Sequence, residues 1–414
     1  MLLTSGSPTV QQGIVAIGHC EYECFNFLVL LSCKRLHVGN CLRCELRTGN
    51  GAYDDAAPGQ IPEIRIEACK PYEMGFGIGR HFEAMIRSRV ANDPHLSSTL
   101  LPYAKTKQGQ RLVQLLSENN RERYPDYWDE LRGLADGSGV PFLSIILINF
   151  RKEIGPFLPD IRARRIVEEP DQCSDILLCS QELAVMVHNE DGDGSLENHV
   201  YFVHATLENG TTFFAYTCAG ELPSCCFGFN SHGVAFSLDS VPPAPEEVEP
   251  GGIGRNFVSR DLLQSTDIND ALQRTRVASL SAGHCYNIMD VNVRKIFNVE
   301  TASRGRSSVR EITGEPFYHA NMYQHLQAVK QITHESSVHR VKRVSELSMS
   351  TLEEMLKVLG DDSNREFPVY MQGPQQYTLC TAIFDMNQRS LIVLTGNPSS
   401  RCVLRNISMI PLEV

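Results

Sequence analysis

The sequence contains no apolar run long enough to cross a bilayer. The longest candidate near its start, residues 25–31, falls far short of the ~20 apolar residues that a membrane-spanning helix needs. This segment also lacks a basic flank before it and a clear small-residue cleavage site after it, so we expect no signal peptide. These absences favour a cytoplasmic protein without a membrane partner.

Positive charge is scarce as well. Lys and Arg number 38 against 49 Asp and Glu, which gives a formal net charge of −11. A nucleic-acid-binding protein carries a basic face, so we expect no nucleic-acid partner. No internal repeat or low-complexity tract is visible, and 42% hydrophobic with 21% charged residues is typical of a globular protein. A chain of 414 residues has room for one large domain or about two or three ordinary ones.

The 14 cysteines come without a secretory signal, which favours a reducing compartment and free thiols over a disulfide framework. Five of them fall in residues 1–58: Cys20, Cys24, Cys33, Cys41 and Cys44. Thiolates a few residues apart can share a tetrahedral zinc ion, so a zinc-stabilised interaction module is one interpretation of this segment. No His completes a familiar zinc pattern, and residues 48–60 are rich in Gly, Ala, Asp and Pro. We therefore expect a flexible extension over residues 1–58.

Residues 59–172 are predicted to be mainly helical. Alternating apolar residues predict one strand over residues 61–69. The glycines of Gly75-Phe76-Gly77-Ile78-Gly79 do not match the spacing of a dinucleotide-binding loop, so we interpret them as a tight strand-to-helix entry and expect no nucleotide cofactor. The apolar patterns predict helices over these ranges: 80–90, 108–119, 124–135 and 141–153.

From Cys173 onward the apolar pattern changes to period two. The expected strands cover 183–187, 201–205, 211–217, 227–236 (as a hairpin), 285–290, 295–300, 378–385 and 390–395. Asn209-Gly210 is a strong hairpin signal between two of them. The expected helices cover 257–263, 267–275 and 351–359. This order predicts an α+β fold of large antiparallel sheets with helices packed outside them.

The change of pattern falls on Asp171-Gln172-Cys173-Ser174-Asp175. One interpretation of Cys173 is a buried free cysteine at the start of a strand. The other is a nucleophile that self-cleavage turns into a chain N-terminus. Such a thiol needs few partners, because its own α-amine, with a pKa of about 7.7–8.0, is the general base. His188 and His319 offer a conventional Cys–His pair, but the amine makes a His base unnecessary.

Several segments, in this order, resemble the isopenicillin N acyltransferase family. They are Cys173-Ser174, Asn189-Glu190-Asp191, residues 228–234 and His319-Ala320-Asn321, with residues 133–141 and 149–153 similar to the family's pro-region. The family includes the peptidase C45 group and the insect β-alanyl-amine hydrolases. The resemblance covers roughly residues 60–400. It implies an N-terminal-nucleophile (Ntn) hydrolase αββα sandwich with a helical pro-region.

The same resemblance implies the parts of a site. Autocatalytic cleavage between Gln172 and Cys173 would leave a pro-region or α-chain, with its helical part at residues 59–172, and a β-chain, residues 173–414, joined as a heterodimer. Cys173 would be the thiol nucleophile. Asp191 would orient the amine, and Asn321 would supply the oxyanion-hole amide. The segment that begins at Asp191-Gly192 lacks the calcium-loop pattern, so we expect neither a metal nor another cofactor.

Two departures from the family shape the functional prediction. The residue before the cleaved bond is usually Gly in the family, and here it is Gln172, which adopts strained backbone angles less readily. An uncleaved, inactive binding relative therefore stays open. Residues 367–373 lack the Arg that accompanies acyl transfer in the penicillin enzyme. We therefore predict a cysteine amidohydrolase that cleaves a small N-acyl amine or amino-acid conjugate through a Cys173 thioester, with an acyl-CoA-dependent N-acyltransferase as the alternative.

Overall fold

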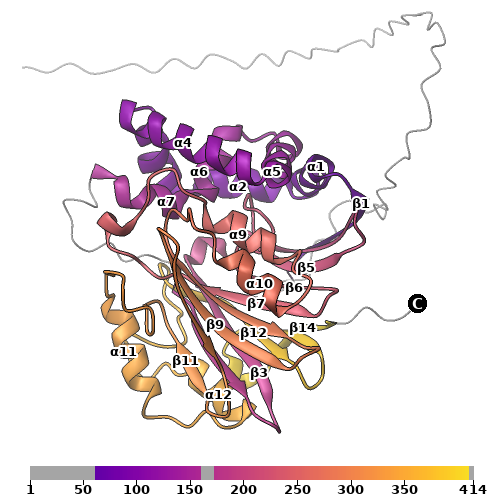
Figure 1. Cartoon of the computed structure of the whole chain (residues 1–414), viewed down its shortest axis with the longest axis vertical. Helices are drawn as coiled ribbons and strands as arrows, with labels where there is room; N and C mark the ends of the chain where they lie inside the picture. Colours follow the sequence, from indigo (N-terminus) through magenta and orange to yellow (C-terminus); the bar gives the residue numbers. More distant parts are fainter. Residues whose placement is uncertain (1–60, 160–171, 410–414) are drawn as a thin grey trace, which may run out of the picture. The chain divides into compact units, whose positions relative to one another are not determined.

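The computed structural model describes residues 61–159 and 172–409, and Figure 1 shows their arrangement. The predicted extension over residues 1–58 and its cysteines lie outside the described residues. The described helices are α1 Pro71–His81, α2 Glu83–Asn92, α3 Leu101–Ala104, α4 Lys107–Arg123, α5 Pro125–Ser138, α6 Phe142–Asn149, α7 Arg151–Ile154, α9 Arg255–Leu262, α10 Ile268–Thr275, α11 Glu335–Val344 and α12 Leu352–Leu359.

The strands form two sheets. The eight-stranded sheet has the order β1 (Glu63–Cys69), β4 (Val200–Leu207), β5 (Thr212–Cys218), β6 (Phe227–Asn230), β7 (Val234–Asp239), β8 (His284–Asp290), β9 (Lys295–Ala302) and β10 (Arg306–Glu311). The six-stranded sheet has the order β11 (Phe317–His319), β2 (Ser174–Cys179), β3 (Ala184–Gly192), β12 (Tyr377–Asp385), β13 (Ser390–Leu394) and β14 (Val403–Ser408). Only the pairing of β1 with β4 is parallel among the described strands.

The apolar side chains divide these elements into four layers. Alternate residues of β4 face opposite ways: Tyr201 and Val203 pack with helices α1 to α6, α9 and α10, whereas Phe202 packs between the two sheets. On β2, Leu177 packs between the sheets and Ile176 packs on α11 and α12. Figure 1 shows helices α1 to α7 on one side of the sheets and α11 with α12 on the other. The predicted α+β class and αββα sandwich are confirmed.

The expected strand-to-helix entry at the glycines is wrong. Helix α1 begins at Pro71, so these glycines lie inside it. Gly75 and Gly79 of α1 face Gly133 and Gly137 of α5, and a Cβ atom on Gly75 would lie 1.9 Å from a backbone oxygen of α5. The glycines therefore let two helix backbones approach closely, and the gain in packing offsets the low helix propensity of Gly.

Strands β10, β11 and β14 and helix α11 are among the elements that were not predicted. Strand β10 is exposed along its second half, β11 has only three residues, and β14 alternates weakly in burial, so none carries a clear period-two pattern. Helix α11 is polar and buries few apolar side chains. The helix matters most here, because it brings a buried side chain to the site described below. None of the described helices combines the length and apolar character that a bilayer crossing requires.

Candidate functional site

Cys173 lies directly before β2, at one end of the six-stranded sheet. The antiparallel pairing of Ser174 with Asn189 places it beside the last residues of β3. Its side chain is 5% exposed and lines a cavity of about 310 Å³, a size that suits a small ligand. Burial, with Glu190 and other nearby carboxylates, raises the pKa of the thiol, while the backbone N–H of Asp191 donates to it and acts in the opposite direction.

Asp191 is fully buried, and only one of its two carboxylate oxygens has a hydrogen-bond partner among the described residues. Its Oδ1 atom accepts a hydrogen bond from Thr378 Oγ1 at 2.5 Å, and its Oδ2 atom has no hydrogen-bond partner among the described residues. Burial raises the pKa of this carboxyl to about 8. Buried polar atoms in native proteins are nearly always paired. An ammonium group delivered to this place would therefore satisfy the carboxylate and stabilise its ionised form.

Asn321 follows β11 and is also buried. Its Nδ2 atom donates to the Ser240 carbonyl oxygen at 2.9 Å, and its Oδ1 atom accepts from Arg340 Nη2 at 2.8 Å. Ser240 lines the cavity, but neither Asn321 nor Asp191 does. The structure therefore gathers the three predicted site residues into one buried cluster in which only Cys173 faces the cavity.

Arg340, on α11, connects these residues and was missed by the sequence analysis. It is fully buried and donates from Nη1 to the Cys173 carbonyl oxygen at 2.8 Å and to Ser174 Oγ at 2.7 Å. Its Nη2 atom donates to Asn321 and, at 3.3 Å, to Gln172 Oε1. Arginine holds its five donors in a fixed plane, so one side chain can orient several acceptors at once. Arg340 thus fixes the chain on both sides of the predicted cleavage bond.

The position of Arg340 also changes one argument from the sequence. The lack of an Arg in residues 367–373 favoured hydrolysis over acyl transfer, yet the site does contain an arginine, supplied by α11. Its guanidinium is not part of the cavity lining. It therefore supports the main chain around Cys173 and has no direct contact with a ligand in the cavity.

Gln172 does not need the backbone freedom of glycine in this conformation. Among the described residues other than glycine, positive φ angles occur at Ser224, Arg294, Arg304, Arg389 and Arg401, and Gln172 is not one of them. The residue is 2% exposed, and its side chain is held by Arg340. Whether the bond after Gln172 is cleaved stays a prediction.

His188 is not available as a base for Cys173. Its Nδ1 atom lies 2.8 Å from Asp175 Oδ2 and its Nε2 atom 3.0 Å from Glu190 Oε2, and the ring is fully buried. Burial alone lowers the pKa of an imidazole, but the two carboxylates outweigh it and raise this pKa well above the usual value. An imidazolium that donates from both nitrogens has no lone pair with which to accept the thiol proton.

His319 occupies a second arrangement of the same kind. Its ring nitrogens lie 2.9 Å from Asp239 Oδ2 and 3.2 Å from Glu300 Oε1. Ser237 Oγ of the eight-stranded sheet donates to Asp175 Oδ1 of the six-stranded sheet at 2.6 Å. The two histidines therefore belong to a polar seam that joins the two sheets.

Residues 228–234, part of the family resemblance, also have a structural role. Asn230 Oδ1 accepts from the backbone N–H groups of His232 and Val234, and Asn230 Nδ2 donates to the Leu263 carbonyl oxygen at 3.2 Å. Gly233 has φ +85°, which a residue with a Cβ atom adopts at a cost. This segment closes the turn between β6 and β7, and none of its residues lines the cavity.

The cavity wall carries many charged groups, most of them paired. Arg89 Nη2 lies 2.6 Å from Glu221 Oε1, and Arg151 Nη2 lies 2.5 Å from Asp93 Oδ2. Three further thiols, Cys218, Cys225 and Cys226, line the same cavity. The sequence analysis did not single them out, because their spacing matches no familiar motif. The wall as a whole suits a small polar ligand with both a charged and an uncharged part.

Comparisons with known proteins identify the family. The family described as acyl-coenzyme A:6-aminopenicillanic acid acyl-transferase matches residues 179–400, a range that includes Asp191 and Asn321 and begins after Cys173. The chain is 25% identical over 356 residues, 79% of its length and 91% of the relative's, to the β-alanyl-dopamine/carcinine hydrolase of Drosophila melanogaster. It is 23% identical over 337 residues, 78% and 90% of the two lengths, to the 40 kDa form of acyl-coenzyme A:6-aminopenicillanic-acid-acyltransferase of Emericella nidulans.

One solved structure found by comparison is the Caenorhabditis elegans N-acylethanolamine-hydrolyzing acid amidase orthologue. The match covers 55% of this chain and 93% of that chain, with 13% identity and a TM-score of 0.36.

Proposed function

Because the chain belongs to the acyl-coenzyme A:6-aminopenicillanic acid acyl-transferase family and is an enzyme that acts on amide bonds, we propose that it is a self-processed cysteine amidohydrolase. Its substrate is a small N-acyl amine or amino-acid conjugate. The observation that carries the proposal is the surroundings of Cys173. The thiol opens on the cavity and accepts the Asp191 N–H, and the Asp191 carboxylate beside it retains an unpaired oxygen.

Processing begins when the Cys173 sulfur adds to the carbonyl carbon of Gln172. The peptide nitrogen leaves as the α-amine of Cys173, and the acyl part becomes a thioester on its sulfur. One water molecule then hydrolyses the thioester, which frees the thiol and leaves a carboxylate on Gln172. Arg340 supports this step by holding Gln172 Oε1 and the Cys173 carbonyl oxygen. The α-amine released at Cys173 lies beside Asp191 Oδ2, which pairs with the ammonium that forms once the amine has accepted the thiol proton.

Catalysis uses the same thiol. The α-amine of Cys173, with a pKa of about 7.7–8.0, takes the thiol proton at neutral pH. The thiolate attacks the substrate carbonyl, and backbone N–H groups stabilise the oxyanion. The Asn321 amide joins them once its side chain turns from the Ser240 carbonyl oxygen towards the cavity. The proton passes to the departing amine, and water releases the acyl group from Cys173.

The two chains produced by processing remain a heterodimer, with the helical part of the first at residues 59–172 and the second at residues 173–414. Strand β1 of the first chain pairs with β4 of the second, and α1 to α7 cover the eight-stranded sheet. The buried pair Arg89–Glu221 and the hydrogen bond from Asn149 Nδ2 to the Gly220 carbonyl oxygen, 2.9 Å, also join them. We place this enzyme in the cytoplasm, where its thiols stay reduced, without nucleic-acid or membrane partners.

Hydrolysis and acyl transfer share one acyl-enzyme and differ only in the acceptor. The Drosophila relative is named a β-alanyl-dopamine/carcinine hydrolase, which supports hydrolysis. An acyl-CoA-dependent acyltransferase remains the alternative, supported by the name of the Emericella relative. Since Arg340 does not line the cavity, it offers no contact for an acyl donor and does not favour transfer.

The test is to trap the acyl group. We expect the purified protein, mixed with β-alanyl-dopamine or other N-acyl amines and quenched in acid, to carry the acyl mass on the peptide that begins at Cys173. Cys173→Ala should abolish both this adduct and amine release. Amide hydrolysis that persists in Cys173→Ala would contradict the proposal, and transfer to an added amine without hydrolysis would favour the acyltransferase.

A further inference from the structure

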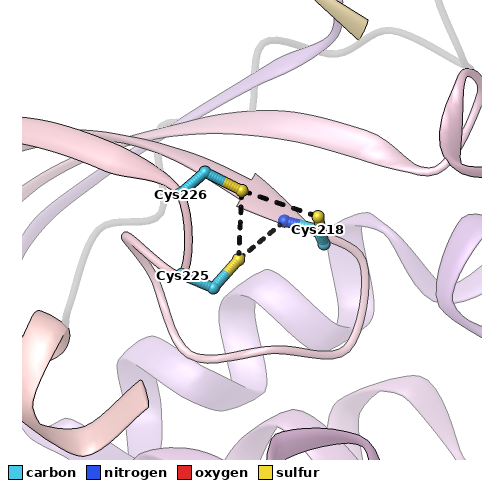
Figure 2. Close-up of side chains that lie close together, drawn as sticks. All are labelled: Cys218, Cys225 and Cys226. Atoms are coloured by element: carbon cyan, nitrogen blue, oxygen red, sulfur yellow. Dashed lines mark hydrogen bonds between the residues drawn. The ribbon is translucent and has the colours of Figure 1, made fainter. Parts of the chain in front are cut away.

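Three thiols converge on one point in the cavity wall, and the proposed reaction at Cys173 uses none of them. Cys218 ends β5, and Cys225 and Cys226 directly precede β6, so a single hairpin connection supplies all three, as Figure 2 shows. The Sγ atoms of Cys218 and Cys226 are 3.7 Å apart, and those of Cys225 and Cys226 are 3.6 Å apart. All three side chains are buried.

This spacing fits the edge of a metal-coordination tetrahedron. Thiolates bind Zn²⁺ at about 2.3 Å, which separates neighbouring sulfur ligands by about 3.8 Å. Apolar packing alone does not explain the arrangement, because buried cysteines that only fill space have no reason to direct three sulfurs at each other. The third pair also fits, since all three sulfurs lie within 4.8 Å of one another.

Glu190 is the candidate fourth ligand, and its side chain has to move to bind, because its carboxylate does not lie within 4.8 Å of all three sulfurs. Its carboxylate hydrogen-bonds with the Cys226 thiol, and it lines the same cavity. His188 donates to Glu190 at 3.0 Å, and Asp175 holds the other ring nitrogen of His188. Metal-ligating carboxylates are themselves commonly held by such hydrogen bonds, which orient them.

One buried cation, Arg89, lines the same cavity as the cluster. Arg89 is fully buried, donates to the Ala219 carbonyl oxygen at 2.6 Å and pairs with Glu221. The cavity that all three thiols line gives an ion a route from solvent.

We propose that Cys218, Cys225 and Cys226, together with the Glu190 carboxylate, bind one thiophilic divalent cation of the Zn²⁺ class in the wall of the cavity that Cys173 lines. Binding displaces the thiol protons to solvent, so no oxidant or reductant takes part. The site does not depend on processing at Cys173, and its proposed ligands all lie within residues 190–226.

The first experiment compares zinc binding by full-length variants in competition with a chromogenic chelator. We expect the wild type to bind one more equivalent of Zn²⁺ than the double variant Cys225→Ser/Cys226→Ser. Loss of two ligands should weaken binding by more than the ~10–100-fold that losing an outer-shell partner costs. Cys380→Ser, a buried thiol of the same apolar cluster, is the matched control and should bind like the wild type. Cys173→Ala should also bind like the wild type, which separates this proposal from the proposed amidohydrolase.

The second experiment needs no variant, so it does not depend on a variant that folds. The wild type is treated with a maleimide with and without Zn²⁺, and the modified peptides are identified by mass spectrometry. We expect Zn²⁺ to protect Cys218, Cys225 and Cys226 and to leave the exposed Cys402 reactive. Equal zinc stoichiometry in the wild type and the double variant, or three thiols that Zn²⁺ does not protect, would overturn the proposal.

Discussion

Cys173 has two neighbourhoods of opposite character. Behind it, every donor atom of the Arg340 guanidinium has an acceptor, from Ser336 to the Cys173 carbonyl oxygen. Beside it, Asp191 keeps one carboxylate oxygen unpaired and a raised pKa. A satisfied buried network fixes geometry, whereas an unpaired buried group costs free energy until a partner arrives. Arg340 therefore holds the bond after Gln172 in place, whereas Asp191 is the group with which the released amine of Cys173 would pair.

Replacing Arg340 should have the largest effect on folding and processing. Arg340→Met deletes several short hydrogen bonds from a fully buried cation and leaves their acceptors unpaired, so we expect a loss of roughly 3–5 kcal/mol in the free energy of unfolding and no detectable processing after Gln172. Urea unfolding and intact mass measure the two effects. Arg343→Met is the control, because this neighbour on α11 pairs with Asp361 near the surface. Normal processing of Arg340→Met would show that Arg340 is not needed to position the bond after Gln172.

A smaller effect separates the polar seam from the chemistry. His188→Asn leaves Asp175 and Glu190 without their shared cation, so we expect a loss of about 3 kcal/mol of stability. Because His188 has no free lone pair, processing by the folded fraction should continue. A folded His188→Asn protein that never processes would show that the histidine acts on Cys173 after all.

A further effect concerns pH. Burial gives Asp191 a pKa of about 8 in the uncleaved chain, above the value of about 3.9 in an unfolded chain. The folded state therefore binds an extra proton between these values. The stability from Asp191 is fully present below about pH 4 and is lost as the pH rises through about 8. Urea unfolding of Cys173→Ala should show this decline, and adding Asp191→Asn should flatten it. An unchanged slope would place the titrating group elsewhere.

The sequence predicted the strands well because most of them alternate with period two. The change at Cys173 was visible for the same reason, since β2 begins at Ser174. Asp191 and Asn321 were identified through a family resemblance, and the structure places both beside the cysteine. Their positions at the ends of β3 and β11 follow from the pairing of these strands with β2.

The remaining features depend on contacts between distant segments. Arg340 lies 167 residues from Cys173 and on a polar helix, so no local pattern connects the two. The glycines of α1 can be understood only with those of α5, which they face. Cys218 and Cys226 come into contact because the hairpin between β5 and β6 folds back, and their spacing along the chain does not predict this contact.

The most direct test of the central claim is the intact mass of the purified protein with N-terminal sequencing of its fragments. We expect two chains of 172 and 242 residues (414 − 172 = 242), the second beginning Cys-Ser-Asp, whose masses sum to that of the full chain plus one water. Cys173→Ala should remain a single chain. A wild type that stays uncleaved and has no amidase activity would contradict the account and leave an inactive binding relative.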